Sequence, residues 1–145
     1  MPVSALFRVR AALVIGLAGV FTTCSEHGAF DPIVACSDSQ SVTIHVSAGL
    51  KPLFNWTPSC GMSSLQVLPD TGGNWVWALF SGTHSAENPL PSGIRYGVVP
   101  PKGIGALEAA PLVRGMHYRV VVYRWVADSG AAGSLLDRGN AVFTP

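Results

Sequence analysis

The sequence predicts an all-β fold, a single antiparallel sandwich of two sheets with about seven short strands over residues 41–145. Only 12% of the residues are charged, and 16 Gly and 11 Pro mark frequent turns. Short runs alternate between apolar and polar residues, as half-buried strands do. The clearest strand covers about residues 118–125 and is rich in Val, Tyr and Trp, which favour a pleated surface over a helix.

Three strands are expected before residue 70. They cover residues 41–47, 53–57 and 64–68. In the first strand, Val42 and Ile44 alternate with polar residues and share one face. The second strand carries Phe54 and Trp56 on one face and stops at Pro58, so the first two strands read as a hairpin.

Four strands are expected after the turn at 69–74. They cover residues 75–80, 94–99, about 118–125 and 134–143, the last interrupted near Gly139. In 94–99, alternation would bury Ile94, Tyr96 and Val98. We expect a loop over residues 81–93 and either a loop or a short strand over 103–110, where glycine and proline leave no room for a stable helix.

The first 23 residues have the features of a bacterial export signal. Arg8 and Arg10 precede an apolar run, residues 11–21, that is too short to span a bilayer comfortably. A buried N-terminal helix is the alternative, although core helices rarely lack polar positions over three turns. We therefore expect an exported protein of the cell envelope, with a flexible polar tether over residues 24–40.

Cys24 is a candidate for lipidation. Thr22-Thr23-Cys24-Ser25 resembles a bacterial lipoprotein cleavage site, although Thr23 departs from the small residue usual before the cysteine. An acylated Cys24 would tether the domain to a membrane surface, firmly if multiply acylated. Ordinary cleavage, for example after Ser25, is the alternative, and the mass of the mature chain distinguishes the two.

Cys36 and Cys60 are the expected disulfide. Three cysteines in an exported chain leave one over, and acylation of Cys24 would leave these two to pair. They flank the first two predicted strands and so fall at the same end of that hairpin. Closing this loop would stabilise the domain by roughly 3 kcal/mol. Two unpaired buried thiols are the alternative.

The charge balance gives no support to nucleic-acid binding. Without Arg8 and Arg10, seven basic residues face eight acidic ones, a net charge of about minus one. No basic run or stripe of arginine and aromatic residues is present, so no electrostatic footprint for a nucleic acid is expected.

Leu112, Gly115 and Tyr118 resemble the tyrosine corner of fibronectin type III and related immunoglobulin-like domains. Trp56 lies where that family's second strand carries its core Trp. The resemblance covers most of residues 41–145 and implies a sandwich that serves as a spacer or binding module, without specifying a ligand. It also implies that the three corner residues are structural, with the Tyr118 hydroxyl bonded back to the preceding turn.

No motif for catalysis, metal binding or cofactor binding stands out. The histidines are scattered, without the short spacings of a metal site, and the carboxylates are few and dispersed over predicted loops. No nucleophile elbow or phosphate-binding loop is present. We expect a noncatalytic module without a metal or cofactor. The alternative is a small secreted hydrolase or carbohydrate-active protein with a site built from loops.

Alternate residues of the clearest strand are candidates for a binding surface. If Tyr118, Val120 and Val122 face the core, then Val121, Tyr123 and Trp125 face outward. Likewise, either Trp75, Trp77 and Leu79 or Val76, Ala78 and Phe80 belong to the core. Exposed aromatic residues in a row mark recognition faces for proteins or sugars. The alternative is that the long loop over residues 81–111 covers them.

Overall fold

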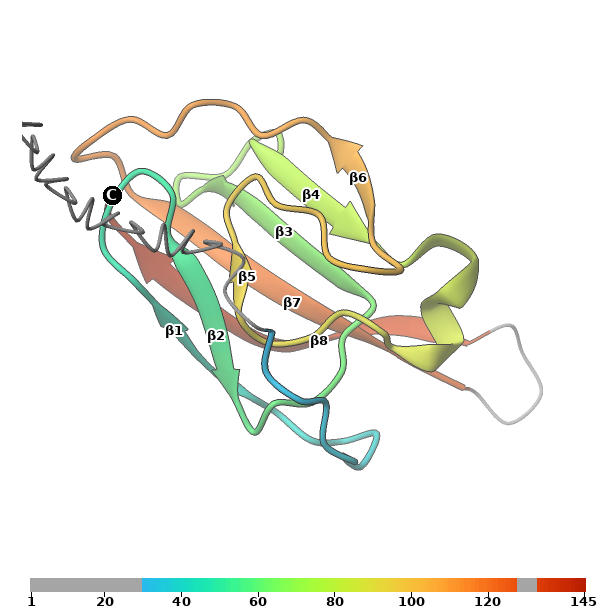
Figure 1. Cartoon of the computed structure of the whole chain (residues 1–145). Coiled ribbons are helices and arrows are strands. Elements are labelled where there is room, and N and C mark those ends of the chain that lie inside the picture. Colours follow the sequence, from blue (N-terminus) through green and yellow to red (C-terminus); the bar gives the residue numbers. More distant parts are fainter. Residues whose placement is uncertain (1–29, 128–132) are drawn as a thin grey trace, which may run out of the picture.

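The computed structural model describes residues 30–127 and 133–145, and these form a sandwich of two antiparallel sheets (Figure 1). The smaller sheet has the order β1-β2-β5 and the larger has the order β6-β4-β3-β7-β8. The strands are β1 (Thr43–Val46), β2 (Leu53–Thr57), β3 (Ser64–Pro69), β4 (Trp77–Phe80), β5 (Ile94–Arg95), β6 (Ile104–Leu107), β7 (Tyr118–Val126) and β8 (Ser134–Phe143). The all-β sandwich predicted from the sequence is confirmed. The predicted signal peptide and Cys24 lie outside the described residues.

The core forms where the two sheets face one another. Phe54 and Trp56 project from β2, and both are essentially inaccessible to solvent. The Phe54 ring stacks on Trp77 of β4 at 6.3 Å and meets the edge of Phe143 of β8 at 5.6 Å. Large rings bring the most apolar area into such a core, and these contacts join the two sheets.

Within β4, Trp77 and Leu79 face the core, but neither of the two predicted alternating sets is buried as a whole, because Trp75 is exposed and Val76 packs against the core. Trp77 and Leu79 are fully buried against the smaller sheet, whereas Phe80 lies on the other face of β4 and is half-buried. Trp75 precedes the strand and is 44% exposed. Strand β4 begins at Trp77, two residues later than predicted.

The predicted strand at 94–99 is much shorter in the structure. Ile94 and Tyr96 are buried as expected, but Val98 is 42% exposed, so its predicted burial was wrong. The chain turns at Gly97, which has a φ of +82° and ends the alternation. Residues 81–93, expected as a loop, include a short 3₁₀ helix, η1 (Gly82–Glu87), and residues 103–110, expected as a loop or a short strand, include the edge strand β6.

The open side of the sandwich next to β8 is closed by β1. The Val42 amide donates to the Arg138 carbonyl at 2.7 Å. A side chain at Gly139 would bring its Cβ within 2.5 Å of the Val42 carbonyl oxygen, so only glycine permits this approach. Strand β8 runs through Gly139, and the interruption expected there is an irregularity in its pairing with β7.

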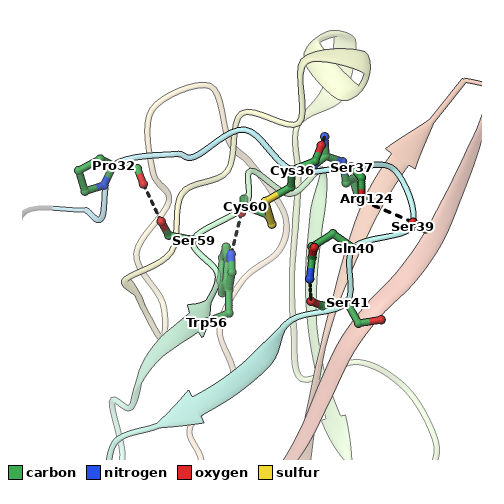
Figure 2. Close-up of a disulfide and its surroundings, with 10 residues drawn as sticks. All are labelled: Pro32, Cys36, Ser37, Ser39, Gln40, Ser41, Trp56, Ser59, Cys60 and Arg124. Carbon is green, nitrogen blue, oxygen red and sulfur yellow. Dashed lines mark hydrogen bonds between the residues drawn. A yellow bond between two sulfur atoms is a disulfide. The ribbon is translucent and has the colours of Figure 1, made fainter.

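The described part of the predicted tether, residues 30–40, lies against the sandwich. The Asp31 amide donates to Ser92 O at 3.0 Å, and the Val34 amide donates to Ser59 O at 3.1 Å. The Ser59 hydroxyl in turn donates to Pro32 O at 2.8 Å (Figure 2). This finding differs from the flexible tether that the polar composition indicated, because backbone bonds and a disulfide fix the segment.

The predicted disulfide between Cys36 and Cys60 is present, with a Cα–Cα distance of 5.7 Å (Figure 2). The Trp56 indole donates to Cys60 O at 2.7 Å and so satisfies a buried N–H group. Arg124 of β7 donates to Cys36 O at 3.2 Å. The bridge thus links the N-terminal segment, the turn after β2 and the larger sheet.

Candidate binding surface

The outer face of the larger sheet, turned away from the smaller sheet, carries a set of apolar side chains. Cross-strand pairing fixes which residues share this face: Phe80 and Tyr123 both oppose Ser64, and Ile104 opposes Phe80. We call this surface the outer apolar face. It consists of Leu68, Trp75, Phe80, Ile104, Leu107, Val121, Tyr123 and Val142.

Its most exposed members lie at the two edges and at the start of β4. Ile104 is 56% exposed, Val142 50% and Trp75 44%. The Trp75 ring contacts Phe80 with centroids 5.9 Å apart, so the two rings form one platform beside β6. The solvent-exposed part of the outer apolar face is therefore both aliphatic and aromatic.

The three predicted binding residues occupy different environments on β7. Val121 lies on the outer face opposite Gln66, but only 7% of its surface is exposed. Tyr123 is half-buried between Ser64 and Asp137, and burial, followed by the negative charge of Asp137, raises the pKa of its phenol. Tyr123 therefore presents more surface than Val121 to a partner.

Trp125 lies at the far end of β7, where Asn88 clamps its backbone. The Trp125 amide donates to Asn88 Oδ1 at 2.7 Å, and Asn88 Nδ2 donates to Trp125 O at 3.0 Å. Asn88 is only 7% exposed and has a left-handed φ of 48°, which asparagine tolerates better than most residues. The half-buried Trp125 ring lies against Gly133. Asn88 was not predicted as part of this site, because in the sequence it resembles an ordinary loop residue beside a proline.

The predicted corner residues come together as a structural unit. Tyr118 is 3% exposed, and its hydroxyl accepts a hydrogen bond from the Val113 amide at 3.1 Å. Leu112 is buried, Gly115 has a φ of +79° in the turn, and the Tyr118 ring stacks on Phe143 at 5.8 Å. These contacts fix the chain before β7.

A shallow groove of about 420 Å³ beside η1 gathers several of the described charged groups. Asp31, Glu87 and Lys102 line it together with Phe30, Ile33 and three prolines. Lys102 Nζ lies 2.7 Å from Glu87 Oε2, and His84 Nδ1 lies 3.0 Å from Glu87 Oε1. The hydrogen bond from Lys102, then the one from His84, lowers the pKa of Glu87 to about 2. Glu87 is therefore ionised at any physiological pH.

Within residues 30–127 and 133–145, no group of three or more His, Cys, Asp or Glu side chains could hold a metal ion. In the same part of the chain, no helix is long and apolar enough to cross a membrane.

Strand β6 is the part of this surface that could not be predicted from the sequence. Residues Ile104 and Leu107 are separated by small residues, so no alternation marks the strand, and a register irregularity at Ala78 and Leu79 puts both on the outer face. Pairing with β4 alone makes this stretch a strand.

Comparisons of the chain with protein-family models, with curated proteins and with solved structures found no match.

Proposed function

We propose that this protein is a noncatalytic, exported module of the cell envelope that binds or positions a partner through its outer apolar face. The observation that carries the proposal is the Trp75–Phe80 platform, continued by Ile104 and Leu107 on one side and Tyr123 on the other. Apolar and aromatic side chains held in water on a rigid sheet are typical of recognition surfaces.

The partner is a protein or a carbohydrate, and the composition of the face favours a protein. Aromatic rings can stack on sugars, but Ile104, Leu107 and Val142 are aliphatic and among the more exposed residues of the face. Such residues gain most by packing against another apolar surface.

We further propose that the domain is related to fibronectin type III and immunoglobulin-like domains. The neighbours β1-β2-β5 and β3-β7-β8 have the sequence order of strands A-B-E and C-F-G in that architecture. The tyrosine contact before β7 supports the same relationship. Strands β4 and β6 extend the second sheet beyond this common set.

Export is supported by the disulfide, because such bridges persist in oxidising compartments. Lipidation at Cys24 remains a prediction from the sequence.

A small hydrolase is the second candidate, since Asp31 and Glu87 line one groove. A pair of carboxylates that cleaves a glycosidic bond needs one with a raised pKa to donate a proton. Glu87 has a pKa of about 2 and is bound to Lys102, so it is unsuited both to donate a proton and to act as a strong base. The charged cluster is better explained as a surface ion-pair network.

The test compares immobilised wild-type protein with the variants Trp75→Ala and Ile104→Ser in capture from native envelope extract and in binding to soluble cell-wall polysaccharides. Val113→Ser is the matched control, because Val113 is 53% exposed but lies on the corner loop. We expect a ligand that wild type and Val113→Ser retain and the two face variants lose. Equal retention of the ligand by all four proteins would contradict the proposal.

A further inference from the structure

We propose that two copies of this chain associate by antiparallel pairing of their β6 strands. Strand β6 is the outermost strand of the larger sheet and pairs with β4 on one side. All four of its residues are exposed, and none is charged or proline. The opposite side of β6 therefore presents backbone N–H and C=O groups that a further strand can use.

The remaining edges of the described sheets differ from β6. Strand β8 is approached by the segment that leads into β1, where the amide of Val42, the residue before β1, donates to the Arg138 carbonyl. Strand β5 has only two residues, Ile94 and Arg95, too few to template a ladder. Natural sheet edges are commonly protected by shortness, charge, proline or coverage. Of the four edge strands, β1 and β8 approach each other and β5 has only two residues, so β6 is the least covered.

The charges that flank β6 favour a second copy over an unrelated strand. Lys102 precedes the strand by two residues and Glu108 follows it directly, and both are exposed. When two β6 strands pair antiparallel with Gly105 opposite Gly105, the turn that carries Lys102 in each copy lies beside the end of β6 that Glu108 follows in the other. The two-fold symmetry makes the attraction between these charges occur twice. A parallel arrangement would instead bring like charges together at both ends.

The pairing produces one continuous sheet across the two copies. Ile104 and Leu107 lie on the outer face, so the exposed apolar residues of both copies would meet at the new junction. Burial of these side chains adds to the backbone hydrogen bonds. This inference does not rest on the proposed function, because self-association requires no other partner.

The first experiment measures the mass of the exported protein by sedimentation equilibrium and follows disulfide cross-linking of Gly105→Cys under mild oxidation. Gly105 has ordinary space for a Cβ, with Val99 at 3.4 Å, and would face its own counterpart. Val142→Cys, on strand β8 and 50% exposed, is the control for random collision. We expect a dimer and cross-linking of Gly105→Cys that is much faster than that of Val142→Cys.

The second experiment reverses the flanking charges. Lys102→Glu and Glu108→Lys alone should each weaken the dimer about tenfold, and the double variant should restore it. Lys102→Glu also breaks the ion pair with Glu87 inside each copy, and the double variant does not repair that pair. Recovery in the double variant can therefore come only from contact between copies.

A monomer at every concentration would overturn the proposal, even if a separate extended peptide added to the edge of β6. A dimer whose affinity is the same in all the charge variants would also overturn it, because the flanking charges set the pairing.

Discussion

The two faces of the larger sheet are built from the same strands but have different roles. On the inner face, Trp77, Leu79 and Val120 are at most 1% exposed. On the outer face, Ile104 and Leu107 are 56% and 41% exposed, although they are as apolar as the core residues. Residue type alone therefore does not decide which face of a sheet is buried. The smaller sheet decides it by covering one face.

The largest difference between the faces should appear in a pair of tryptophan variants. Trp77→Ala should lower the free energy of unfolding by about 3–5 kcal/mol, because it removes a buried ring that contacts Phe54 and Tyr96. Trp75→Ala should cost about 1 kcal/mol or less, since its ring is partly in water and contacts Phe80. Urea unfolding of both variants measures this, and equal losses would contradict the assignment of the faces.

A smaller effect should come from Tyr96, which contacts Trp77 on the inner face and donates its hydroxyl to Ala110 O at 2.6 Å. Tyr96→Phe should cost about 1 kcal/mol below about pH 10. Burial raises the pKa of Tyr96 to about 12, so the folded protein holds this proton more tightly than the unfolded chain.

The stabilisation from this raised pKa is complete below the unfolded pKa of about 10 and is lost as the pH rises through 12. Urea unfolding across this range should show the advantage of wild type over Tyr96→Phe shrinking as the pH rises. A constant difference between the two proteins would mean that the hydroxyl is not buried as described.

The smallest effect concerns tryptophan fluorescence. Trp56 and Trp77 are each 1% exposed, whereas Trp75 is 44% exposed and Trp125 is half-buried. Iodide should quench part of the emission, and Trp75→Phe should remove the largest accessible share. Emission that iodide cannot quench at all would show that the outer face is covered and would remove the basis for a binding surface.

The strands predicted most accurately were those with strict alternation or many Val and aromatic residues. Strands β1, β2 and β3 lie within a residue or two of their expected limits, and β7 begins at Tyr118 as expected. Their local sequence and their tertiary environment favour the same conformation. The disulfide was predicted from the odd number of cysteines, and the hairpin supported it because Cys36 and Cys60 flank its two strands.

The candidate surface was predicted only in part. Alternation placed Tyr123 on the outer face, but it gave no sign that Val121 would be covered or that Asn88 would hold Trp125. Neither contact is local: Asn88 lies 37 residues before Trp125. Contacts over such separations depend on how the loops return to the sheet.

The all-β class and most of the strands could be predicted from the sequence alone, because side-chain alternation and turn residues mark them along the chain. The cysteine count predicted the Cys36–Cys60 pair. Three features depend on contacts between distant segments: which face of β4 meets the core, the packing of residues 30–40 against the sandwich, and the edge strand Ile104–Leu107. In each of these cases the deciding groups belong to a distant segment, so the local sequence pattern did not decide the outcome.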